Sequence, residues 1–261
     1  MKIATFNING VRARIETLTG WLAAARPDVV VLQEIKTQDE AFPREAIEDL
    51  GYAVETHGQK GFNGVAILSL LPLEDVSRGL AGDDDDEQAR YIEASVIGRT
   101  AVRIAGLYLP NGNPQPGPKF DYKLAWMERL HTRARELLAA ELPTVMLGDY
   151  NVIPEPRDAA HPEKWHDDAL FQPESRAALR RILFDGWTDA VRLHDPDATR
   201  GPFTFWDYQG GAWQRDNGIR IDHVLLSPQA ADLLTGLGID RDERARDKPS
   251  DHVPVWVELD A

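Results

Sequence analysis

Polar side chains interrupt or end five apolar segments of this sequence, at places where a buried strand normally carries only apolar residues. A lone carboxylate there must be paired or bind a cation, because burying an unpaired charge is costly. Any one of them could serve as a structural hydrogen-bonding group, but five such places in one chain favour a shared site. The residues are Asn7, Asn9, Glu34, Asp149, Asn151, Asp222, Asp251 and His252.

The chemistry of this set favours a hard cation. The side chains offer amide and carboxylate oxygens, and the chain contains no cysteine, so Mg²⁺ or Mn²⁺ fits better than zinc. Mg²⁺ takes one or two carboxylates and completes its shell with water and substrate phosphate. His252 is then a charge partner for that phosphate rather than a ligand, and Asp222 is a candidate to fix its tautomer or keep it protonated. The pattern predicts metal-assisted phosphoryl transfer.

Eight apolar runs supply the strands that would carry these residues. Several are nearly continuous in Val, Ile and Leu, which is typical of strands covered on both faces. Only three residues separate two of the runs, which indicates a hairpin and therefore mixed sheets. The runs cover residues 2–8, 28–35, 64–70, 91–97, 101–109, 143–151, 221–227 and 253–259.

Three helices are expected between the runs. Apolar residues recur at three- and four-residue steps over 120–142, and Pro143 ends this pattern. Shorter helical patterns cover 15–25 and 173–183. The expected fold class is α/β, with two packed mixed β-sheets flanked by outer helices in a four-layer sandwich. Without a linker or repeat, residues 1–261 are expected to form one domain.

Composition limits the class of protein. The N-terminus lacks the pattern of a signal peptide and no apolar run is long enough to span a bilayer, so a cytoplasmic protein without a membrane partner is expected. The net charge of −14 argues against a broadly basic nucleic-acid-binding surface, but it does not exclude a local basic groove. The acidic run 83–88 is either a solvated loop or a weak cation site.

The chain resembles exonuclease III, the bacterial AP endonuclease family of the endonuclease/exonuclease/phosphatase superfamily. The resemblance runs nearly end to end. The matching fragments, in the family's order, are "FNINGVRAR", "PDVVVLQEIK", "HGQKGFNGVAIL", "GLYLPNG", "LGDYNV", "FTFWDYQ", "GIRIDHVLLS" and "KPSDHVPVW". It implies the same two-sheet sandwich.

The resemblance also implies roles for single residues. Glu34 is the main Mg²⁺ ligand, and the other residues near the metal or its waters are Asn7, Asn9, Asp149, Asn151 and Asp251. Asp149 orients and deprotonates the attacking water, and Asn151 stabilises the pentacovalent phosphate. Tyr108 contacts the phosphate or the leaving oxygen. His252, supported by Asp222, binds the phosphate.

The resemblance further implies a DNA-contacting surface. Phe203, Phe205 and Trp206 form the wall that accepts an extrahelical sugar, although all three are also of a type that packs in a core. The expected phosphate contacts are Arg12, Arg90, Lys119 and Arg220, each of which could equally be a solvated surface charge. Segment 154–173 has no match within the resemblance, and Trp165 in it is either a packing residue or a substrate contact.

The expected function is a Mg²⁺-dependent DNA repair nuclease. It cleaves the phosphodiester 5′ to an abasic site in double-stranded DNA. It also acts on 3′-end lesions, as a 3′→5′ exonuclease or 3′-end trimming enzyme. The protein is expected to be a monomer. Two other functions stay open. One is a phosphoesterase of the same superfamily that acts on inositol phosphates or phospholipid headgroups, and the other is a non-catalytic DNA-binding protein.

Overall fold

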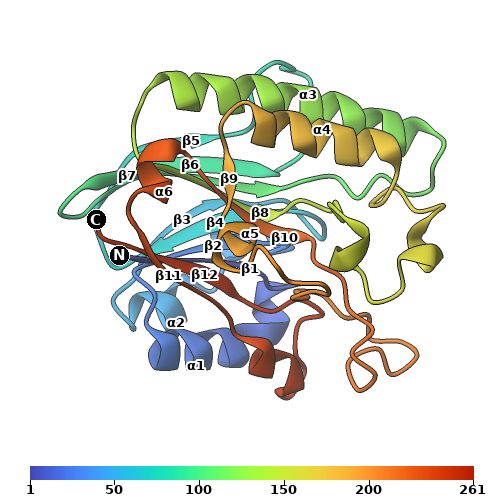
Figure 1. Ribbon diagram of the computed structural model, residues 1–261. Coiled ribbons are helices and arrows are strands. Elements are labelled where there is room, and N and C mark those ends of the chain that lie inside the picture. Colours follow the sequence, from blue (N-terminus) through green and yellow to red (C-terminus); the bar gives the residue numbers. More distant parts are fainter.

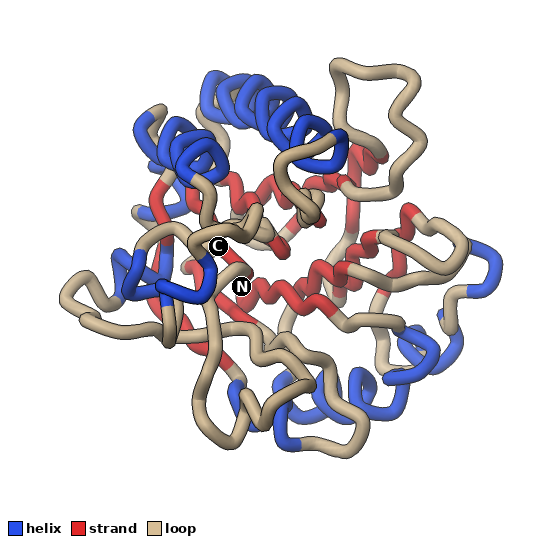
Figure 2. Tube along the Cα trace, turned by 90° about the vertical axis from the view of Figure 1, so that its right-hand side faces the viewer, coloured by secondary structure: helices blue, strands red, loops and turns tan.

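The computed structural model describes residues 1–261 and contains two six-stranded sheets that pack face to face, with helices outside both (Figure 1). Helices α3 (Pro118–Ala139) and α4 (Pro173–Phe184) cover one sheet, and α1 (Ile15–Ala25) and α2 (Arg44–Glu48) cover the other. Figure 2 shows the two strand layers end on, between helices. The predicted four-layer α/β class is confirmed.

Each sheet contains one parallel pair of strands among antiparallel neighbours. In the first sheet β1 and β2 are parallel, and in the second β7 and β8 are parallel. The first sheet, in spatial order, comprises β11 (Leu234–Ile239), β12 (Val255–Leu259), β1 (Lys2–Asn7), β2 (Val29–Gln33), β4 (Val65–Ser69) and β3 (Ala53–His57). The second comprises β5 (Leu73–Arg78), β6 (Tyr91–Ile97), β7 (Ala101–Tyr108), β8 (Thr144–Asp149), β10 (Asp222–Leu226) and β9 (Thr188–Asp189).

Short helical turns complete the fold. The remaining α-helices are α5 (Ala190–His194) and α6 (Pro228–Ala231). The 3₁₀ turns are η1 (Val11–Arg14), η2 (Asp39–Ala41), η3 (Pro156–Asp158), η4 (Pro162–Trp165) and η5 (Arg241–Ala245). Two of these turns, η3 and η4, lie in the irregular segment 154–173. None of the helices combines the length and the apolar character needed to cross a membrane.

Three apolar layers hold the sandwich together. Between the sheets, strands of both contribute β-branched side chains such as Val31, Ile104 and Val145. A second layer joins the second sheet to α3 and α4, and a third joins the first sheet to α1. Strands in such a sheet are buried on both faces, which explains the nearly continuous apolar runs in the sequence.

All eight predicted strand runs are strands, and the predicted hairpin is the antiparallel pair β6–β7. The predicted helices correspond to α1, α3 and α4; α3 ends at Ala139, four residues before Pro143. The strands β3, β5, β9 and β11 were not predicted. They lie at or beside the sheet edges, where one face is exposed and the apolar pattern is weaker.

The strand register places three predicted catalytic residues in one row. Tyr108 pairs with Asp149 across β7 and β8, and Asp149 pairs with Asp222 across β8 and β10. Gly148 makes this register possible, because a Cβ atom there would stand 1.9 Å from the carbonyl oxygen of Leu107. Gly148 lies within β8, where its lack of a side chain allows close contact with β7.

Candidate active site

The two sheets meet at one end of the sandwich through the side chain of Asn7. Asn7 is the last residue of β1, and its Nδ2 donates to Oδ2 of Asp149, the last residue of β8, at 2.9 Å. The same Nδ2 donates to Oε1 of Glu34 at 2.9 Å. Asn7 and Asp149 are buried. One amide therefore holds carboxylates from both sheets, and the predicted convergence of Asn7, Glu34 and Asp149 is observed.

Left-handed backbone conformations turn the chain at the strand ends. Glu34 has φ of 50°, and Asn9 and Asn151 each have φ of 47°. Asparagine enters this region readily, whereas a glutamate there is under strain of roughly 1–3 kcal/mol. The turn at Glu34 is held by the N–H of Gly10, which donates to the Glu34 carbonyl at 2.7 Å. This strain lies at the residue whose carboxylate faces Asn7.

Glu34, Asp149 and His252 offer ligand atoms that all lie within 4.8 Å of one another. The two carboxylates suit a hard divalent cation. Lys36 Nζ occupies part of the space around Glu34, 2.7 Å from its carboxylate, and would have to move or share that carboxylate with a cation. The donor set fits Mg²⁺ or Mn²⁺, with Glu34 and Asp149 as the carboxylate ligands.

His252 is held as a cation by two aspartates. Its Nδ1 lies 2.9 Å from Oδ2 of Asp222, and its Nε2 lies 3.7 Å from Oδ2 of Asp149. Burial alone would lower the pKa of the imidazole, but the charges of Asp222 and Asp149 outweigh it and raise the pKa to about 10. A protonated imidazole has no lone pair for a metal, so His252 is suited to an anionic phosphate instead.

The pKa values of the two carboxylates move in opposite directions. Burial raises the pKa of Asp149 to about 7, and His252 only partly offsets it. Burial alone would raise the pKa of Glu34 as well. The charge and hydrogen bond of Lys36, together with the hydrogen bond from Asn7, outweigh burial and lower the pKa of Glu34 below its ordinary value. Metal-assisted hydrolysis needs a metal ligand that stays ionised, which suits Glu34, and a base with a pKa near neutrality, which suits Asp149.

Asn9 and Asp251 form an outer layer of the cluster. Asn9 Nδ2 donates to Oδ1 of Asp251 at 3.0 Å, and the Asn9 backbone N–H donates to Oδ1 of Asn7 at 3.0 Å. Lys36 Nζ donates to Oδ1 of Asn9 at 2.6 Å. Both residues are half-buried at the rim. Their predicted place near the metal or its waters stays a prediction.

Asn151 is fixed next to Asp149 by an extended set of hydrogen bonds. Its backbone N–H donates to Asp149 Oδ1 and its Nδ2 donates to the carbonyl of Leu109, both at 2.9 Å. Buried Lys123 donates to the Asn151 carbonyl at 2.5 Å. Tyr108 lies one strand away, half-buried, and burial raises the pKa of its phenol well above the ordinary value, with Glu34 adding to the shift. A neutral phenol is a hydrogen-bond donor to phosphate.

Three of the four predicted phosphate contacts are available to a ligand. Arg12 and Lys119 are exposed and form no ion pair. Arg90 is half-buried, lies 4.8 Å from the ring centre of Tyr108 and donates to the Tyr108 carbonyl. Arg90 is thus tied to a predicted catalytic residue.

The prediction that Arg220 contacts DNA is wrong. Its side chain is fully buried, with Nε 2.6 Å from Asp158 and Nη1 2.8 Å from Asp189. Its charge is neutralised inside the protein, two residues before Asp222. The arginine joins η3, β9 and the start of β10, so its role is structural.

Replacing Arg220 with methionine should lower the free energy of unfolding by roughly 3–5 kcal/mol, because Asp189 would stay buried without its cationic partner and Asp158 would keep only Arg192. Urea denaturation measures this. The matched control is Arg99→Met, which removes an exposed ion pair with Asp260 and should cost under about 1 kcal/mol. Equal losses in the two variants would contradict the structural role.

The predicted sugar-accepting wall is largely a core. Phe203 and Trp206 are buried, and Trp206 packs edge to face on Trp213 at 4.9 Å between ring centres. Their prediction as ligand contacts is wrong, because a buried ring cannot stack on a ligand. Phe205 differs: it is partly exposed, and its ring centre lies 5.0 Å from that of His252.

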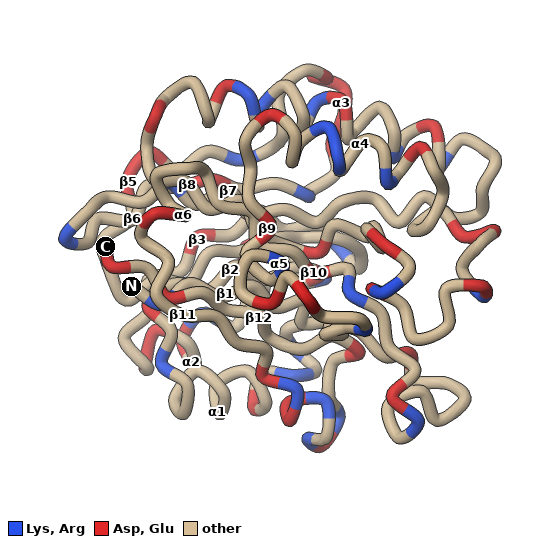
Figure 3. Tube along the Cα trace, in the orientation of Figure 1, with Lys and Arg blue, Asp and Glu red and all other residues tan.

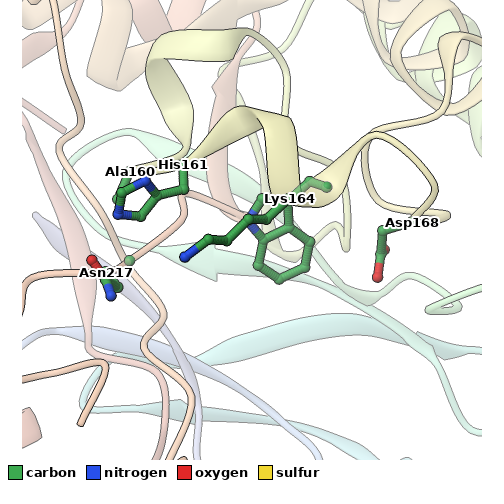
Figure 4. A pocket seen from close by; sticks show the side chains of 7 residues that line it. Ala160, His161, Lys164, Asp168 and Asn217 are labelled. Atoms are coloured by element: carbon green, nitrogen blue, oxygen red, sulfur yellow. The ribbon is translucent and has the colours of Figure 1, made fainter. Parts of the chain in front are cut away.

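Trp165 serves partly in packing. Its ring packs against a small apolar cluster that includes Ile219, and Phe205 packs against the same cluster. It also lines a cavity of about 200 Å³ together with His161, Lys164 and Asn217 (Figure 4). Both alternatives for Trp165 therefore have support, and the prediction that it contacts DNA remains untested.

Sequence reasoning missed the lysines of the site. Lys36 stands two residues after Glu34, in a left-handed conformation with φ of 53°, and nothing in the strand pattern shows that it turns back. Lys123 lies in α3 among apolar neighbours, and only the tertiary structure shows its contact with Asn151. Burial lowers the pKa of Lys123 to about 7, with Asp149 and Asp168 opposing the shift.

Comparisons with known proteins agree with this geometry. The Endonuclease/Exonuclease/phosphatase family matches residues 4–252. The exodeoxyribonuclease III of Haemophilus influenzae is 36% identical over 99% of this chain and 100% of its own length, and the DNA repair nuclease APEX1 of Danio rerio is 30% identical over 99% and 82%. An AP endonuclease from Archaeoglobus fulgidus has a TM-score of 0.94 and 37% identity over the whole of both chains.

A Neisseria structure, the 3′ phosphatase NExo bound to a product DNA hairpin, has a TM-score of 0.95 and 38% identity, again over the whole of both chains. The sequence and the fold of this chain are therefore similar over their whole length to those of nucleases and a 3′ phosphatase of DNA. The chain belongs to the Endonuclease/Exonuclease/phosphatase family and is a nuclease-type hydrolase.

Proposed function

We propose that this protein is a Mg²⁺-dependent DNA repair nuclease that cleaves the phosphodiester 5′ to an abasic site and also trims 3′ ends. The single observation that carries the proposal is the cluster in which Asn7 joins Glu34 to Asp149 beside His252. The names of the relatives support a DNA substrate. We also propose that residues 1–261 act as one catalytic domain, since the cluster takes residues from both sheets, and that the protein is a monomer, since one chain supplies the whole cluster.

The residues have distinct parts in the proposed reaction. Asp149 orients a water molecule and accepts its proton as the water oxygen attacks phosphorus. The bond between phosphorus and the 3′-oxygen breaks in line. The 3′-oxygen takes up a proton from solvent and leaves as a 3′-hydroxyl, and the phosphate stays on the 5′ side of the abasic residue. In this proposal His252, kept cationic by Asp222, binds a non-bridging oxygen, and Asn151 and Tyr108 donate to the same phosphate; the proximity of these side chains to Asp149 supports these roles. A bound Mg²⁺ or Mn²⁺ held by Glu34 and Asp149 would neutralise charge on the phosphate.

Metal removal provides the direct test. With Mg²⁺, the purified protein should cleave a duplex with one abasic site and release nucleotides or phosphate from recessed 3′-hydroxyl and 3′-phosphate ends. EDTA should abolish each activity and added Mg²⁺ restore it. Cleavage that persists in EDTA would contradict the metal site, and no cleavage of any duplex with Mg²⁺ would favour a non-catalytic DNA-binding protein.

Substrate choice is tested in parallel. An intact duplex and an inositol phosphate serve as the matched controls under the same conditions. A faster reaction on the inositol phosphate than on every DNA substrate would contradict the proposal and favour the other phosphoesterases of the family.

DNA affinity should depend on salt despite the net charge of −14. Neutralised phosphates release counterions, so log Kd should rise with log salt concentration, and the double variant Arg12→Gln/Lys119→Gln should lower the slope by roughly 2. The measurement is titration of an abasic duplex in EDTA at several salt concentrations. A wild-type slope near zero would mean that no phosphates are neutralised.

A further inference from the structure

A second cavity, of about 500 Å³, lies beside α4, β9 and α5. None of the side chains of the metal and phosphate cluster lines it. Its walls instead bring together arginines from separate parts of the chain, and the acidic character of the protein as a whole makes this gathering unexpected. Figure 3 shows basic positions along α4. The five arginines are Arg157, Arg176, Arg180, Arg192 and Arg220.

The positive charge in this cavity is only partly neutralised. Three carboxylates contact three of the five guanidinium groups. Glu155 pairs with Arg157, and Asp158 and Asp189 pair with Arg192 and Arg220, so Arg176 and Arg180 are left without a carboxylate partner. The side chain of Arg180 forms no ion pair or hydrogen bond, and the side chain of Arg176 donates only to the carbonyl of Pro154, at 2.9 Å. Arg176 and Arg180 are one helical turn apart on α4, so both face the same wall.

Arg192 adds an unused donor at this cavity. Its Nη2 pairs with Asp158 and its Nη1 donates to the Gly201 carbonyl at 3.0 Å, but its buried Nε has no partner. Burial and the neighbouring arginines lower the pKa of Arg192, and the same causes act on Arg176. An anion between these side chains would relieve the repulsion among the arginines.

Apolar side chains complete the walls. Leu179, Leu183 and Leu193 line the cavity with Trp187. Ligand pockets of roughly 300–1,000 Å³ combine such an apolar lining with a few polar groups that fix orientation. The cavity thus offers room for an organic group as well as for a phosphate.

We propose that this arginine cavity binds a phosphate monoester of nucleotide size, with the phosphate held by Arg176, Arg180 and Arg192 and the organic part against the leucines. A planar guanidinium group can donate two parallel hydrogen bonds to two oxygens of one phosphate. The volume of about 500 Å³ is large enough for a single nucleotide. This site is separate from the cluster around Glu34 and does not depend on nuclease activity.

Calorimetric titration of the full-length protein in EDTA tests the site, with 2′-deoxyadenosine 5′-monophosphate as the probe. Removing two guanidinium partners in Arg176→Gln/Arg180→Gln should weaken binding at least roughly tenfold. The control Arg99→Gln/Arg135→Gln removes two exposed arginines elsewhere and should leave the affinity unchanged. Arg180→Gln alone, which breaks no contact, keeps the test valid if the double variant fails to fold.

Two further arms locate the ligand and define it. His252→Gln should bind the nucleotide as the wild type does, whereas loss of binding there would place the ligand in the phosphate site and overturn the proposal. Deoxyadenosine and inorganic phosphate should each bind more weakly than the nucleotide. Equal affinity for inorganic phosphate would overturn the assigned apolar wall, and no saturable binding, or binding unchanged in both arginine variants, would overturn the site.

Discussion

Replacing Asp149 with asparagine is expected to lower the turnover number on an abasic duplex by roughly two to four orders of magnitude, as for the loss of a general base. The asparagine has one acceptor oxygen, so it can keep the hydrogen bond from the Asn151 N–H while its NH2 group faces the Asn7 donor, and it cannot accept a proton from water. The pKa of Asp149, raised to about 7 by burial, places its proton acceptance close to neutral pH. Single-turnover cleavage at saturating protein isolates this chemical step.

Two controls accompany this variant. Asp232→Asn changes an exposed carboxylate that accepts no side-chain hydrogen bond and should cleave at the wild-type rate. Thermal unfolding should show that the Asp149 variant is folded. If folded Asp149→Asn cleaved the abasic duplex within a few-fold of the wild type, Asp149 would not be the base.

The second large effect is expected from His252. Replacing it with glutamine should lower the rate of cleavage by roughly two to three orders of magnitude, which is typical for removal of one preorganised donor to a developing anion. Glutamine keeps a donor but lacks the positive charge that Asp222 and Asp149 maintain on the imidazole. His194→Gln, an exposed histidine in α5, is the matched control and should leave the rate unchanged.

The pH dependence separates charge from hydrogen bonding. If protonated His252 is the active form, the rate falls as pH rises through its pKa, which is about 10 in the wild type. Asp222→Asn removes the largest cause of the upward shift, so the pKa drops and the fall in rate should begin at lower pH. Rate–pH profiles of the two proteins from pH 6 to 10 measure this shift. Superimposable alkaline limbs would show that Asp222 does not maintain the charge.

Much of the fold could be predicted from the sequence because its pattern is local. The buried strands read as continuous Val, Ile and Leu, and α1 and α3 show helical spacing of apolar residues. The edge strand β3 and the two-residue β9 lack that signal. The polar residues at the strand ends are also a local signal, since a carboxylate beside an apolar run is visible in the sequence. Such a carboxylate requires a partner in the folded protein.

The partners themselves could not be read from the chain. The sequence does not distinguish Arg220 from Arg12, since both are single arginines near a predicted site residue. In the structure Arg220 is buried and neutralised, whereas Arg12 is exposed. Phe203 and Phe205 are two residues apart, and in a regular strand their side chains would point to the same face. The segment is not a regular strand, so Phe203 is buried and only Phe205 lies beside His252. These differences depend on contacts between distant segments.

The sequence by itself determined the two-sheet fold and the polar residues at the strand ends, because both rest on residue types and short-range spacing, and it indicated the family through a resemblance that runs nearly end to end. The tertiary structure alone decided that Asn7 bridges Glu34 to Asp149, that His252 stands between two aspartates, and that Arg220 is structural. Charge, pKa and access depend on burial and on the charges within a few ångströms, and those are set by how the two sheets meet.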